Sequence, residues 1–386
     1  MRIFKNLTIL ELSSVLAGPS VGMYFAELGA NVVKIENPNT NGDVTRSWKL
    51  PQEDKQGDLS SYFCCVNWGK KSIALNLEKS EDYKVFKELV KISDIITVSY
   101  KFGDDTKLKV DYKSIKKINP KIIYTQITGF GLDDERTAFD AVIQAYSGFM
   151  YMNGLPETDP LKMPVALIDI LAAHQIKEAI LLAYIEKLKA GKGSFVECSL
   201  LQAGISSLAN QASNFLNARI IPQRTGSDHP NIFPYGTTFL TSDNKHILLA
   251  IGKDKQFKLF CRYFDFDNKI DLEKYSSNFN RVKFREELKR NISEILCKYN
   301  SKKLIKILDT IKIPSAIVKN MKEVFEQEKA RELLLIEEKD GKKYYGVRTN
   351  TAIINDKKFI KISSPPHLDE NRKDILKLIK KTNTKI

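Results

Sequence analysis

The N-terminal half of the chain alternates between short apolar runs and longer segments in which apolar residues recur at helical spacing. The apolar runs predict strands at residues 7–11, 30–36, 72–77, 94–100 and 121–131. The helical spacing predicts helices at residues 19–28, 81–92 and 139–152. Strands separated by helices of this length are typical of a doubly wound α/β sheet. Ligands of such sheets bind at the carboxyl ends of the strands, which here means the loops near residues 15–19, 99–103 and 129–131.

Residues 163–200 contain a long helical pattern with a carboxylate at its start. An apolar run ends at Asp169, and apolar residues then recur at helical spacing as far as Gly191. A glycine-bearing turn and a further strand pattern, SFVECSL, follow. An Asp at the start of a helix is usually an N-cap, which accepts hydrogen bonds from the free N–H groups of the first turn. Position alone therefore predicts that Asp169 caps this helix.

The first strand–helix–strand unit shares two features with dinucleotide-binding enzymes. Its turn places Gly18 and a helix N-terminus where an anionic group could bind. Glu36, at the end of the second strand, stands where such enzymes keep an acid that binds the ribose. The turn reads AGPSVG rather than G-x-G-x-x-G, however, so the sequence argues against a nicotinamide cofactor.

The second half of the chain predicts a smaller α/β domain after a linker. Residues 217–236 contain three prolines and several polar residues, which is typical of a linker. The elements predicted beyond it are a strand near 245–252, helices near 254–263, 281–298 and 302–311, a strand at 313–318 and a final helix at 374–381. The expected divisions are a large-domain part at 1–216, the linker at 217–236, the small domain at 237–330 and a return segment at 331–386.

Composition and charge exclude several classes of protein. The 386 residues are 42% hydrophobic and 28% charged, as in ordinary soluble globular proteins. The net charge of +14 comes from lysines spread along the chain without any nucleic-acid-binding motif, so we expect no nucleic-acid partner. A basic surface favours an anionic ligand instead, such as a phosphorylated cofactor.

Membrane, export and metal-binding signals are missing from the sequence. No run of roughly eighteen apolar residues predicts a membrane span, and the N-terminus has no signal-peptide core. The five cysteines and four histidines lack the spacing of metal ligands, so we expect no metal site. Cysteine usage of this kind is consistent with reduced thiols, and we expect a cytoplasmic protein.

Several blocks spread over nearly the whole chain resemble the family III CoA-transferases, the CaiB/BaiF family. These blocks are VLAGP, AELGANVVKIENP, GDVTR, NWGKKSIALNL, FDAVIQAYSGFM, AYIEKLKAGKGSFVECSLL, RTGSDHPNIFPYG and SPPHL. In that family the Asp that begins the helix before the G-K-G turn is the nucleophile, and it matches Asp169. The resemblance also implies a Rossmann-like large domain built from both chain ends, a smaller α/β domain between them, and an interlocked homodimer.

The resemblance further implies an enzyme of acyl-CoA metabolism with no permanently bound cofactor. Its substrates would be a coenzyme A thioester and a carboxylic acid. The CoA contacts implied are Val15, Leu16, Asn37, Leu75, Asn76, Ser99, Tyr100, Lys101, Lys107, Thr137, Ala138, Phe139 and Asp140. The chain departs from the family where Ser99 replaces an Asn, where the loop after it lacks a Pro, and where Asn37 replaces an Arg.

The chemistry of a carboxylate agrees with the implied role of Asp169. A carboxylate can attack a thioester to give a mixed anhydride and free CoA thiolate, and the thiolate can return to form an aspartyl-CoA thioester. A helix N-terminus stabilises the ionised carboxylate. Backbone N–H groups must hold the developing oxyanion, and either the AGP turn or the turn at Gly129–Gly131 could supply them.

Two other functions remain open at this point. An α-methylacyl-CoA racemase of the same family needs a base on each face of its substrate. The racemases place a His where this chain has Phe139, which cannot transfer a proton, so the sequence favours the transferase. The departures at Asn37 and Ser99, and Asn371 in place of a family His, are also compatible with a non-catalytic CoA-binding subunit.

Overall fold

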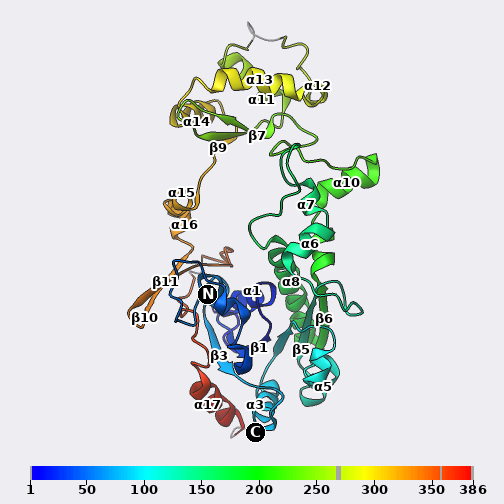
Figure 1. Cartoon of the computed structure of the whole chain (residues 1–386), viewed down its shortest axis with the longest axis vertical. Helices are drawn as coiled ribbons and strands as arrows, with labels where there is room; N and C mark the ends of the chain where they lie inside the picture. The colour runs from blue at the N-terminus through cyan, green and yellow to red at the C-terminus, as the bar shows by residue number, and fades with distance from the viewer. Residues whose placement is uncertain (1, 267–270, 357–358, 384–386) are drawn as a thin grey trace. The chain divides into compact units, whose positions relative to one another are not determined.

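The computed structural model describes residues 2–266, 271–356 and 359–383, and the chain divides into two compact units. The larger unit comprises Met1–Phe149, Lys162–Ala209 and Arg331–Ile386. The second unit comprises Met150–Leu161 and Asn210–Ala330. Segments from both ends of the chain therefore belong to the same unit, as the blue and red ribbons of Figure 1 show.

The larger unit is built on a parallel sheet, for which the described residues supply six strands. These strands are β1 (Thr8–Leu12), β2 (Asn31–Glu36), β3 (Lys70–Ala74), β4 (Ile95–Val98), β5 (Ile123–Thr128) and β6 (Ser194–Ser199). Their order is β3-β2-β1-β4-β5-β6, and every neighbouring pair is parallel. The predicted doubly wound α/β sheet is thus confirmed. The order reverses between β1 and β4, so a ligand crevice is expected at their carboxyl ends.

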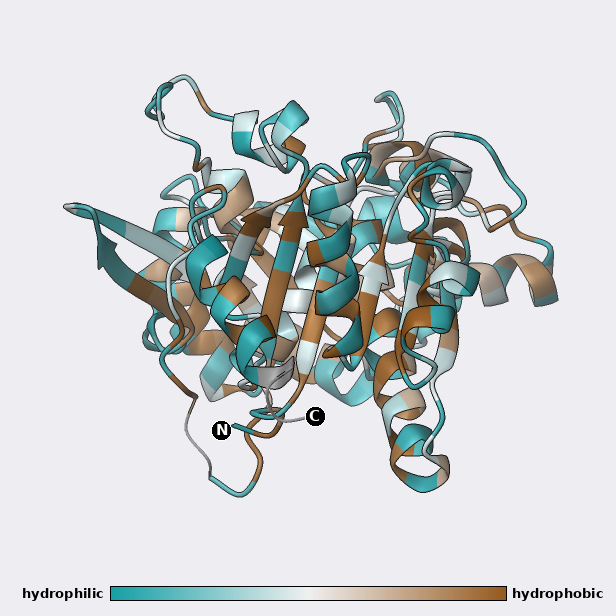
Figure 2. Cartoon of the chain, turned by 90° about the horizontal axis from the view of Figure 1, so that it is seen from below, coloured by the Kyte–Doolittle hydropathy of each residue, from teal (hydrophilic) through white to brown (hydrophobic). Residues whose placement is uncertain are grey.

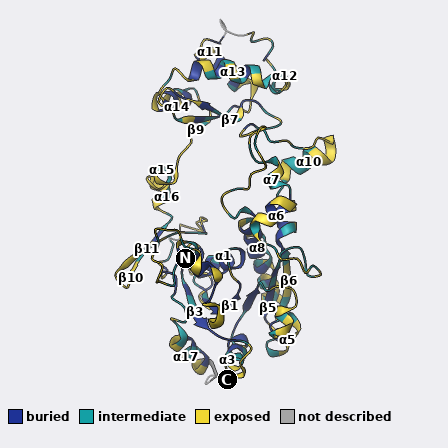
Figure 3. Ribbon diagram, in the orientation of Figure 1, coloured by how far each residue is buried: buried dark blue, intermediate teal, exposed yellow. Residues whose placement is uncertain are grey.

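Both faces of the sheet are covered by helices, which explains why most residues of its central strands β1 and β4 are buried and apolar. Ile9 and Ile95 belong to the core on one face, whereas their neighbours Leu10 and Ile96 belong to the core on the other. Successive side chains of a strand point to opposite faces, so a strand buried on both faces has no polar alternation. Figure 2 shows the strands as mainly hydrophobic with hydrophilic residues between, and Figure 3 shows β1 and β3 as largely buried.

Two sets of helices supply these cores. One face packs against α1 (Ala17–Glu27), α8 (Leu167–Ala190) and α9 (Leu200–Ser206). The other face packs against α3 (Ser80–Lys91), α5 (Tyr112–Ile118) and α17 (Arg372–Asn383). The remaining elements of this part are η1 (Pro38–Thr40), η2 (Val44–Ser47), α2 (Ser61–Cys64), α4 (Asp104–Lys107), α6 (Asp140–Tyr146), and the antiparallel hairpin of β10 (Leu334–Lys339) and β11 (Lys342–Val347). Helix α7 (Phe149–Met152) starts at the last residue of the segment Met1–Phe149 and continues into the second unit.

Two predicted helices are each divided in the structure. The segment predicted as one helix over 139–152 forms α6 and α7, because Gly148 between them adopts a left-handed conformation with a φ of 85°. The segment predicted over 281–298 forms α12 (Asn278–Lys283) and α13 (Arg285–Leu296), which meet at Phe284. Apolar spacing continues across both breaks, so periodicity alone could not locate them.

The second unit has its own antiparallel sheet and hydrophobic core. The sheet has the order β7-β8-β9, with β7 (Tyr235–Leu240), β8 (His246–Ala250) and β9 (Ser315–Ile317). Its other helices are α10 (Ala209–Ala218), α11 (Asp254–Tyr263), α14 (Ser301–Thr310), α15 (Met321–Phe325) and α16 (Glu328–Arg331). Residues 219–234 contain no helix or strand, and β7 begins inside the segment expected to be a linker. Across the described parts of the chain, no helix has the length and apolar content needed to span a bilayer.

Candidate active site

A cavity of about 660 Å³ opens in the larger unit at the carboxyl ends of β1, β4 and β5. Its walls include the turn after β1, from Ser14 to Gly18, and the loop after β4, from Ser99 to Gly103. The loop after β5 contributes Gly129, Gly131 and the segment that leads into α6. The cavity therefore occupies the place where ligands of doubly wound sheets bind.

Most of the residues expected at the site line this cavity. They are Val15, Ser99, Tyr100, Lys101, Thr137, Ala138, Phe139, Asp140 and Asp169. The structure thus brings together loops that are far apart in the sequence. Five of the expected CoA contacts do not line it: Leu16, Asn37, Leu75, Asn76 and Lys107.

Two of the residues outside the cavity have polar partners of their own. The Asn37 side chain accepts a hydrogen bond from the backbone N–H of Asn39 at 2.9 Å and begins the short helix η1. The Lys107 ammonium pairs with Glu78 at 3.1 Å on the exposed surface.

The other three residues outside the cavity serve the fold. Leu16 occupies the N-cap position of α1. Leu75 is buried in the core between the sheet and α3. Asn76 is also buried, and its side chain accepts the N–H of Glu78 to form a turn.

The prediction that Asp169 caps its helix is wrong. Helix α8 begins at Leu167, its N-cap position is Ala166, and Asp169 is the third helical residue. No side-chain capping bond comes from the N-cap residue; instead the N–H of Ile168 donates to Asp140 Oδ1 at 2.7 Å. The apolar residues just before Asp169 form the first turn because Ile168 is buried in the core beside the sheet.

Asp169 has the environment of a reactive carboxylate. Its side chain lines the cavity while only 5% of the residue is exposed, and no group of the described chain donates a hydrogen bond to it. Burial, and secondly the negative charge of Asp140, raise the pKa of Asp169 to about 7. The N-terminal turn of α8 favours its ionised form. Such a carboxylate is poorly solvated but can still ionise near neutral pH.

One residue that the sequence did not indicate, Tyr62, interacts with the charge of this carboxylate. Burial, followed by the charge of Asp169, raises the pKa of the Tyr62 hydroxyl to about 12. The Tyr62 ring packs edge-on against Trp48, with 5.1 Å between the centroids. No motif or periodicity marked either residue, because Tyr62 lies in the four-residue helix α2 and Trp48 directly follows the short helix η2, and both helices are too short to show a period.

Arg136 was also missed, although it directly precedes the expected contacts Thr137–Asp140. It lines the cavity, with its guanidinium 3.8 Å from the centroid of Phe130 and 5.3 Å from that of Tyr146. Asp134 accepts hydrogen bonds from it and fixes its orientation. The net charge suggested an anionic ligand, so a search for cations next to the expected contacts could have identified Arg136.

Buried ion pairs hold both ends of the turn that follows β1. Lys34 Nζ pairs with Glu11 at 3.0 Å and donates to the carbonyl of Ser13 at 2.8 Å. Lys70 Nζ pairs with the same Glu11 at 2.8 Å and donates to the carbonyl of Pro19 at 2.8 Å. Burial lowers the pKa of Lys70 to about 8 even though Glu11 opposes the change. The two lysines therefore hold both ends of this turn in place, and the turn forms one wall of the cavity.

Val15 within this turn has a strained backbone. Its φ is 70°, and a β-branched side chain rarely adopts this left-handed conformation. The Val15 N–H donates to Asp43 Oδ1 at 3.4 Å, and Asp43 in turn pairs with Lys34 at 2.9 Å. For a non-glycine residue such a conformation costs about 1–2 kcal/mol, and strain of this kind often marks functional sites.

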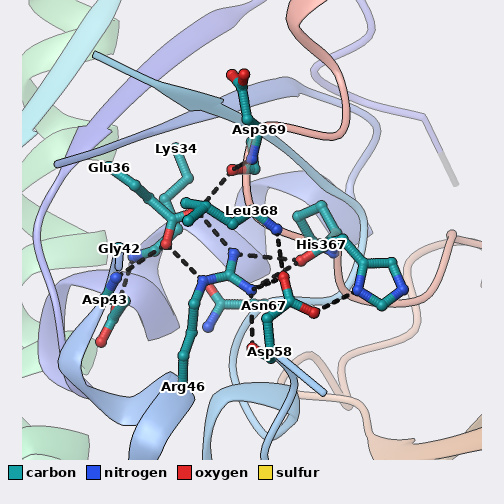
Figure 4. Close-up of polar contacts among 12 residues, drawn as sticks. Lys34, Glu36, Gly42, Asp43, Arg46, Asp58, Asn67, His367, Leu368 and Asp369 are labelled. Carbon is teal, nitrogen blue, oxygen red and sulfur yellow. Dashed lines mark hydrogen bonds and ion pairs between the residues drawn. The ribbon is translucent and has the colours of Figure 1, made fainter. Parts of the chain in front are cut away.

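Figure 4 shows the polar contacts that continue from this cluster to the C-terminal segment. Arg46 makes two hydrogen bonds of 2.7 Å with Glu36 and donates to the carbonyl of Pro366 at 3.2 Å. Asp58 accepts from the backbone N–H of Leu368 at 2.6 Å. Glu36 is therefore committed to Arg46 and is not available to bind a ribose, in agreement with the argument against a nicotinamide cofactor.

Asn371, where the family carries a His, is part of this docking of the return segment. Its side chain accepts the N–H of Ser72 on β3 at 2.9 Å. Its role here is to attach the segment to the sheet, outside the cavity. Within the described ranges, no three His, Cys, Asp or Glu side chains are grouped so as to hold a metal ion.

A doubly wound sheet with a buried, unpartnered carboxylate in its switch-point cavity fits an acyl-transferring enzyme that uses a covalent intermediate. The sequence model of CoA-transferase family III matches residues 4–372, and the chain belongs to that family. As a family III CoA-transferase it moves CoA between an acyl-CoA thioester and a carboxylic acid. The Phe139 ring at the cavity, which cannot transfer a proton, agrees with transfer rather than racemisation.

Relatives of known activity and structure match nearly the whole chain. The succinate–glutarate CoA-transferase of Agrobacterium fabrum is 34% identical over 382 residues, covering 96% of this chain and 94% of that protein. The succinyl-CoA:glutarate CoA-transferase of Homo sapiens is 36% identical over 324 residues, covering 83% and 73%. A CaiB/BaiF family protein from Brucella suis has a similar structure, with a TM-score of 0.85, 32% identity, and coverage of 97% and 98%.

Proposed function

We propose that Asp169 is the nucleophile that carries CoA transfer. Its carboxylate oxygen attacks the thioester carbonyl, the C–S bond breaks, and CoA leaves as a thiolate while a mixed anhydride forms. The thiolate then attacks the aspartyl carbonyl of the anhydride, which gives an aspartyl-CoA thioester and releases the first acid. The acceptor carboxylate attacks the carbonyl of this thioester, the C–S bond breaks, and a second anhydride forms as the CoA thiolate leaves again. The thiolate finally attacks the acceptor's acyl carbonyl, which yields the new acyl-CoA and restores Asp169.

The observation that carries this proposal is the burial of an unpartnered Asp169 carboxylate at the cavity wall. An ionised carboxylate without hydrogen-bond donors has lost the solvation that would make it a weak nucleophile in water. Its raised pKa of about 7 indicates a more basic and hence more nucleophilic oxygen than an exposed Asp provides. Both turns considered as oxyanion donors line the cavity, through Ala17 and Gly18 on one side and Gly129 and Gly131 on the other.

The proposal is tested by replacing Asp169 with Asn. The amide has nearly the same shape but cannot form the anhydride, so CoA transfer should fall by several orders of magnitude while CoA binding is retained. Mass spectrometry must show that the amide has not deamidated to Asp. Substantial turnover by an intact Asn variant would refute the proposed role.

We further infer that the acids exchanged are short dicarboxylic acids. The two relatives reported above are named for succinate and glutarate. Lys101 and Arg136 place cations on the cavity wall, where the second carboxylate of such an acid could pair with them. A screen of acyl-CoA donors against mono- and dicarboxylic acceptors tests this inference. An enzyme that prefers monocarboxylic acids would contradict it.

The remaining expectations about CoA are part of the same proposal. We place CoA along the Val15 turn, the loop from Ser99 to Lys101 and the segment Thr137–Asp140, which the cavity supports. Leu16, Asn37, Leu75, Asn76 and Lys107 stay predictions from the family resemblance. The aspartyl chemistry is complete with these substrates, so we expect no permanently bound cofactor, and the free cysteines suit a reducing, cytoplasmic compartment.

We also propose an interlocked homodimer in which the larger unit is the Rossmann-like domain. The support comes from α8, whose exposed residues include large apolar side chains such as Leu182 and Leu188, with 65% and 69% exposed. Large apolar side chains that are exposed on a single chain are often covered in the assembled protein, so a second chain is the expected cover. Sedimentation that shows a stable folded monomer at micromolar concentration would contradict the dimer.

A further inference from the structure

Two polar residues of α6 hold the segment that leads into α8. Helix α6 packs against α8 in the larger unit (Figure 1). The Asp140 carboxylate accepts two hydrogen bonds of 2.7 Å each, one from the backbone N–H of Ile168 and one from the side-chain amide of Gln144. Ile168 immediately precedes Asp169. One carboxylate therefore connects α6 to the residue next to the nucleophile.

Gln144 extends this connection to the start of the same segment. Its side chain has no exposed surface. Its carbonyl oxygen accepts the backbone N–H of Met163 at 2.8 Å, and its amide nitrogen also lies 3.4 Å from the carbonyl oxygen of Val165. The backbone from Met163 to Ile168 is thus fixed at both ends by side chains of α6. The N-cap residue Ala166 provides no such contact of its own.

We propose that Asp140 is a positioning residue, which orients Asp169 for attack by holding the first turn of α8, and that Gln144 sets the orientation of Asp140. This proposal rests on the proposed role of Asp169 as the nucleophile. It assigns to Asp140 a task different from the CoA contact implied by the family resemblance, although the side chain also lines the cavity. The distance from the Asp140 contact to Asp169 is one peptide unit, so a displaced cap displaces the nucleophile directly.

The hydrogen-bond directions explain why position 140 needs a carboxylate. Both oxygens of Asp140 accept, whereas an Asn could accept on one side only and would present an NH2 group to the NH2 group of Gln144. Gln144 cannot rotate its amide to correct this, because its oxygen is required by the N–H of Met163. The negative charge also has a second effect, since after burial it is the other contribution that raises the pKa of Asp169.

Because donors and acceptors are paired between Asp140 and Gln144, exchanging acid and amide between the two positions tests the proposal. Asp140→Asn places donor against donor, and Gln144→Glu places acceptor against acceptor. In the double variant the Asn amide can donate to the Glu carboxylate, the Asn oxygen can accept from Ile168, and the other Glu oxygen can accept from Met163. The double variant does not restore the 3.4 Å contact with the Val165 carbonyl, so its recovery of activity should be incomplete.

The first readout is the rate at which succinyl-CoA acylates the enzyme, measured with the KM for succinyl-CoA. Misplacement of the nucleophile lowers kcat more than it raises KM, so each single variant should lose about tenfold to a hundredfold in kcat. The double variant should recover to within about tenfold of wild type because its two changes are coupled. A CoA contact would instead show as a raised KM that the second change does not repair. Additive losses in the double variant, or single variants with unchanged kcat, would overturn the proposal.

The second readout does not depend on the chemistry of Asp169. Hydrogen exchange of the full-length protein, followed by mass spectrometry, should be faster over residues 163–170 in each single variant and slower again in the double variant. Equal exchange in all proteins would overturn the positioning role even if activity changed. A wild-type enzyme that transfers CoA without modifying Asp169 would instead count against the proposed function.

Asp111→Ala is the matched control. The Asp111 side chain caps α5 by accepting the N–H of Ser114 at 3.1 Å, and it does not line the cavity. Its removal costs a helix cap of the same kind in the same unit, so stability should fall while kcat and exchange over 163–170 stay unchanged. Loss of kcat in this control equal to that of Asp140→Asn would attribute both effects to lost stability and overturn the proposal.

Discussion

The negative charge of Asp140 acts on the buried carboxyl of Asp169, and together with burial it raises the pKa of Asp169 to about 7. The two side chains line the same cavity, one from the start of α6 and one from the first turn of α8. The proposed nucleophile is therefore half protonated near neutral pH, which has consequences for activity and for stability.

We predict that acylation of the enzyme by its CoA thioester rises with pH through an apparent pKa near 7. Only the ionised carboxylate attacks, so the rate follows its fraction until Asp169 is fully charged. Tyr62, whose pKa is raised by burial and by the charge of Asp169, has a pKa of about 12 and stays neutral over this range. Stopped-flow release of CoA thiolate between pH 5 and 9 measures the profile. A rate that is flat over this range would contradict the prediction.

Because of the same raised pKa, the unfolding free energy of the wild type should fall relative to that of Asp169→Asn as the pH rises. The folded state holds a proton on Asp169 that the unfolded state, with the usual pKa of 3.8, has lost. This contribution is fully present below pH 4 and is lost as the pH rises through about 7. At about 1.4 kcal/mol for each pKa unit, the Asn variant should gain roughly 2–4 kcal/mol in unfolding free energy at pH 8. Urea unfolding at fixed protein concentration at pH 4, 6 and 8 measures it, and parallel curves would contradict it.

Val15→Gly should leave stability nearly unchanged but lower the transfer rate. Glycine relieves the strain of a φ of 70° and loses backbone entropy of similar size, so the two effects offset each other. The freed turn no longer holds its wall of the cavity in place. Thermal unfolding and steady-state kinetics measure the pair of effects. The control is Val33→Gly in β2, where a fully buried side chain is lost and stability should fall sharply; an equal loss at Val15 would contradict the account.

Glu11→Gln should strongly destabilise the larger unit. The change leaves Lys34 and Lys70 buried without the carboxylate that they share, and breaking a buried pair typically costs about 3–5 kcal/mol. Denaturant unfolding measures the loss. Glu81→Gln removes an exposed i,i+3 pair with Lys84 and serves as the control, for which little change is expected. A loss at Glu11 no larger than at Glu81 would show that the buried cluster does not stabilise the fold.

The fold was largely readable from the sequence because its strands are buried on both faces. Such strands form mainly apolar runs, and the helices between them keep helical spacing, so the sheet could be predicted without any contact information. The first residues of the helices were harder to predict from the sequence. The first turn of α8 is capped by Asp140, a residue 28 positions earlier, and no local pattern marks such a partner.

The site could be predicted only in part, because it too depends on partners that lie far away in the sequence. Lys34 and Lys70 resemble surface lysines in the sequence, and their burial depends on Glu11, which lies in another strand. The strain at Val15 likewise depends on Asp43 and cannot be seen in the turn itself. The expectation that Asp169 is the nucleophile came from the family resemblance, since position alone predicted a helix cap.

The most direct test of the account is to capture the acyl group on Asp169. The full-length enzyme is incubated with succinyl-CoA, treated with hydroxylamine, digested and analysed by tandem mass spectrometry, with Asp169→Asn as the control. We predict a hydroxamate on Asp169, formed together with inactivation of the enzyme, and no hydroxamate in the control. Active wild-type enzyme that turns over succinyl-CoA while Asp169 stays unmodified, or that carries the hydroxamate on a different residue, would contradict the central claim.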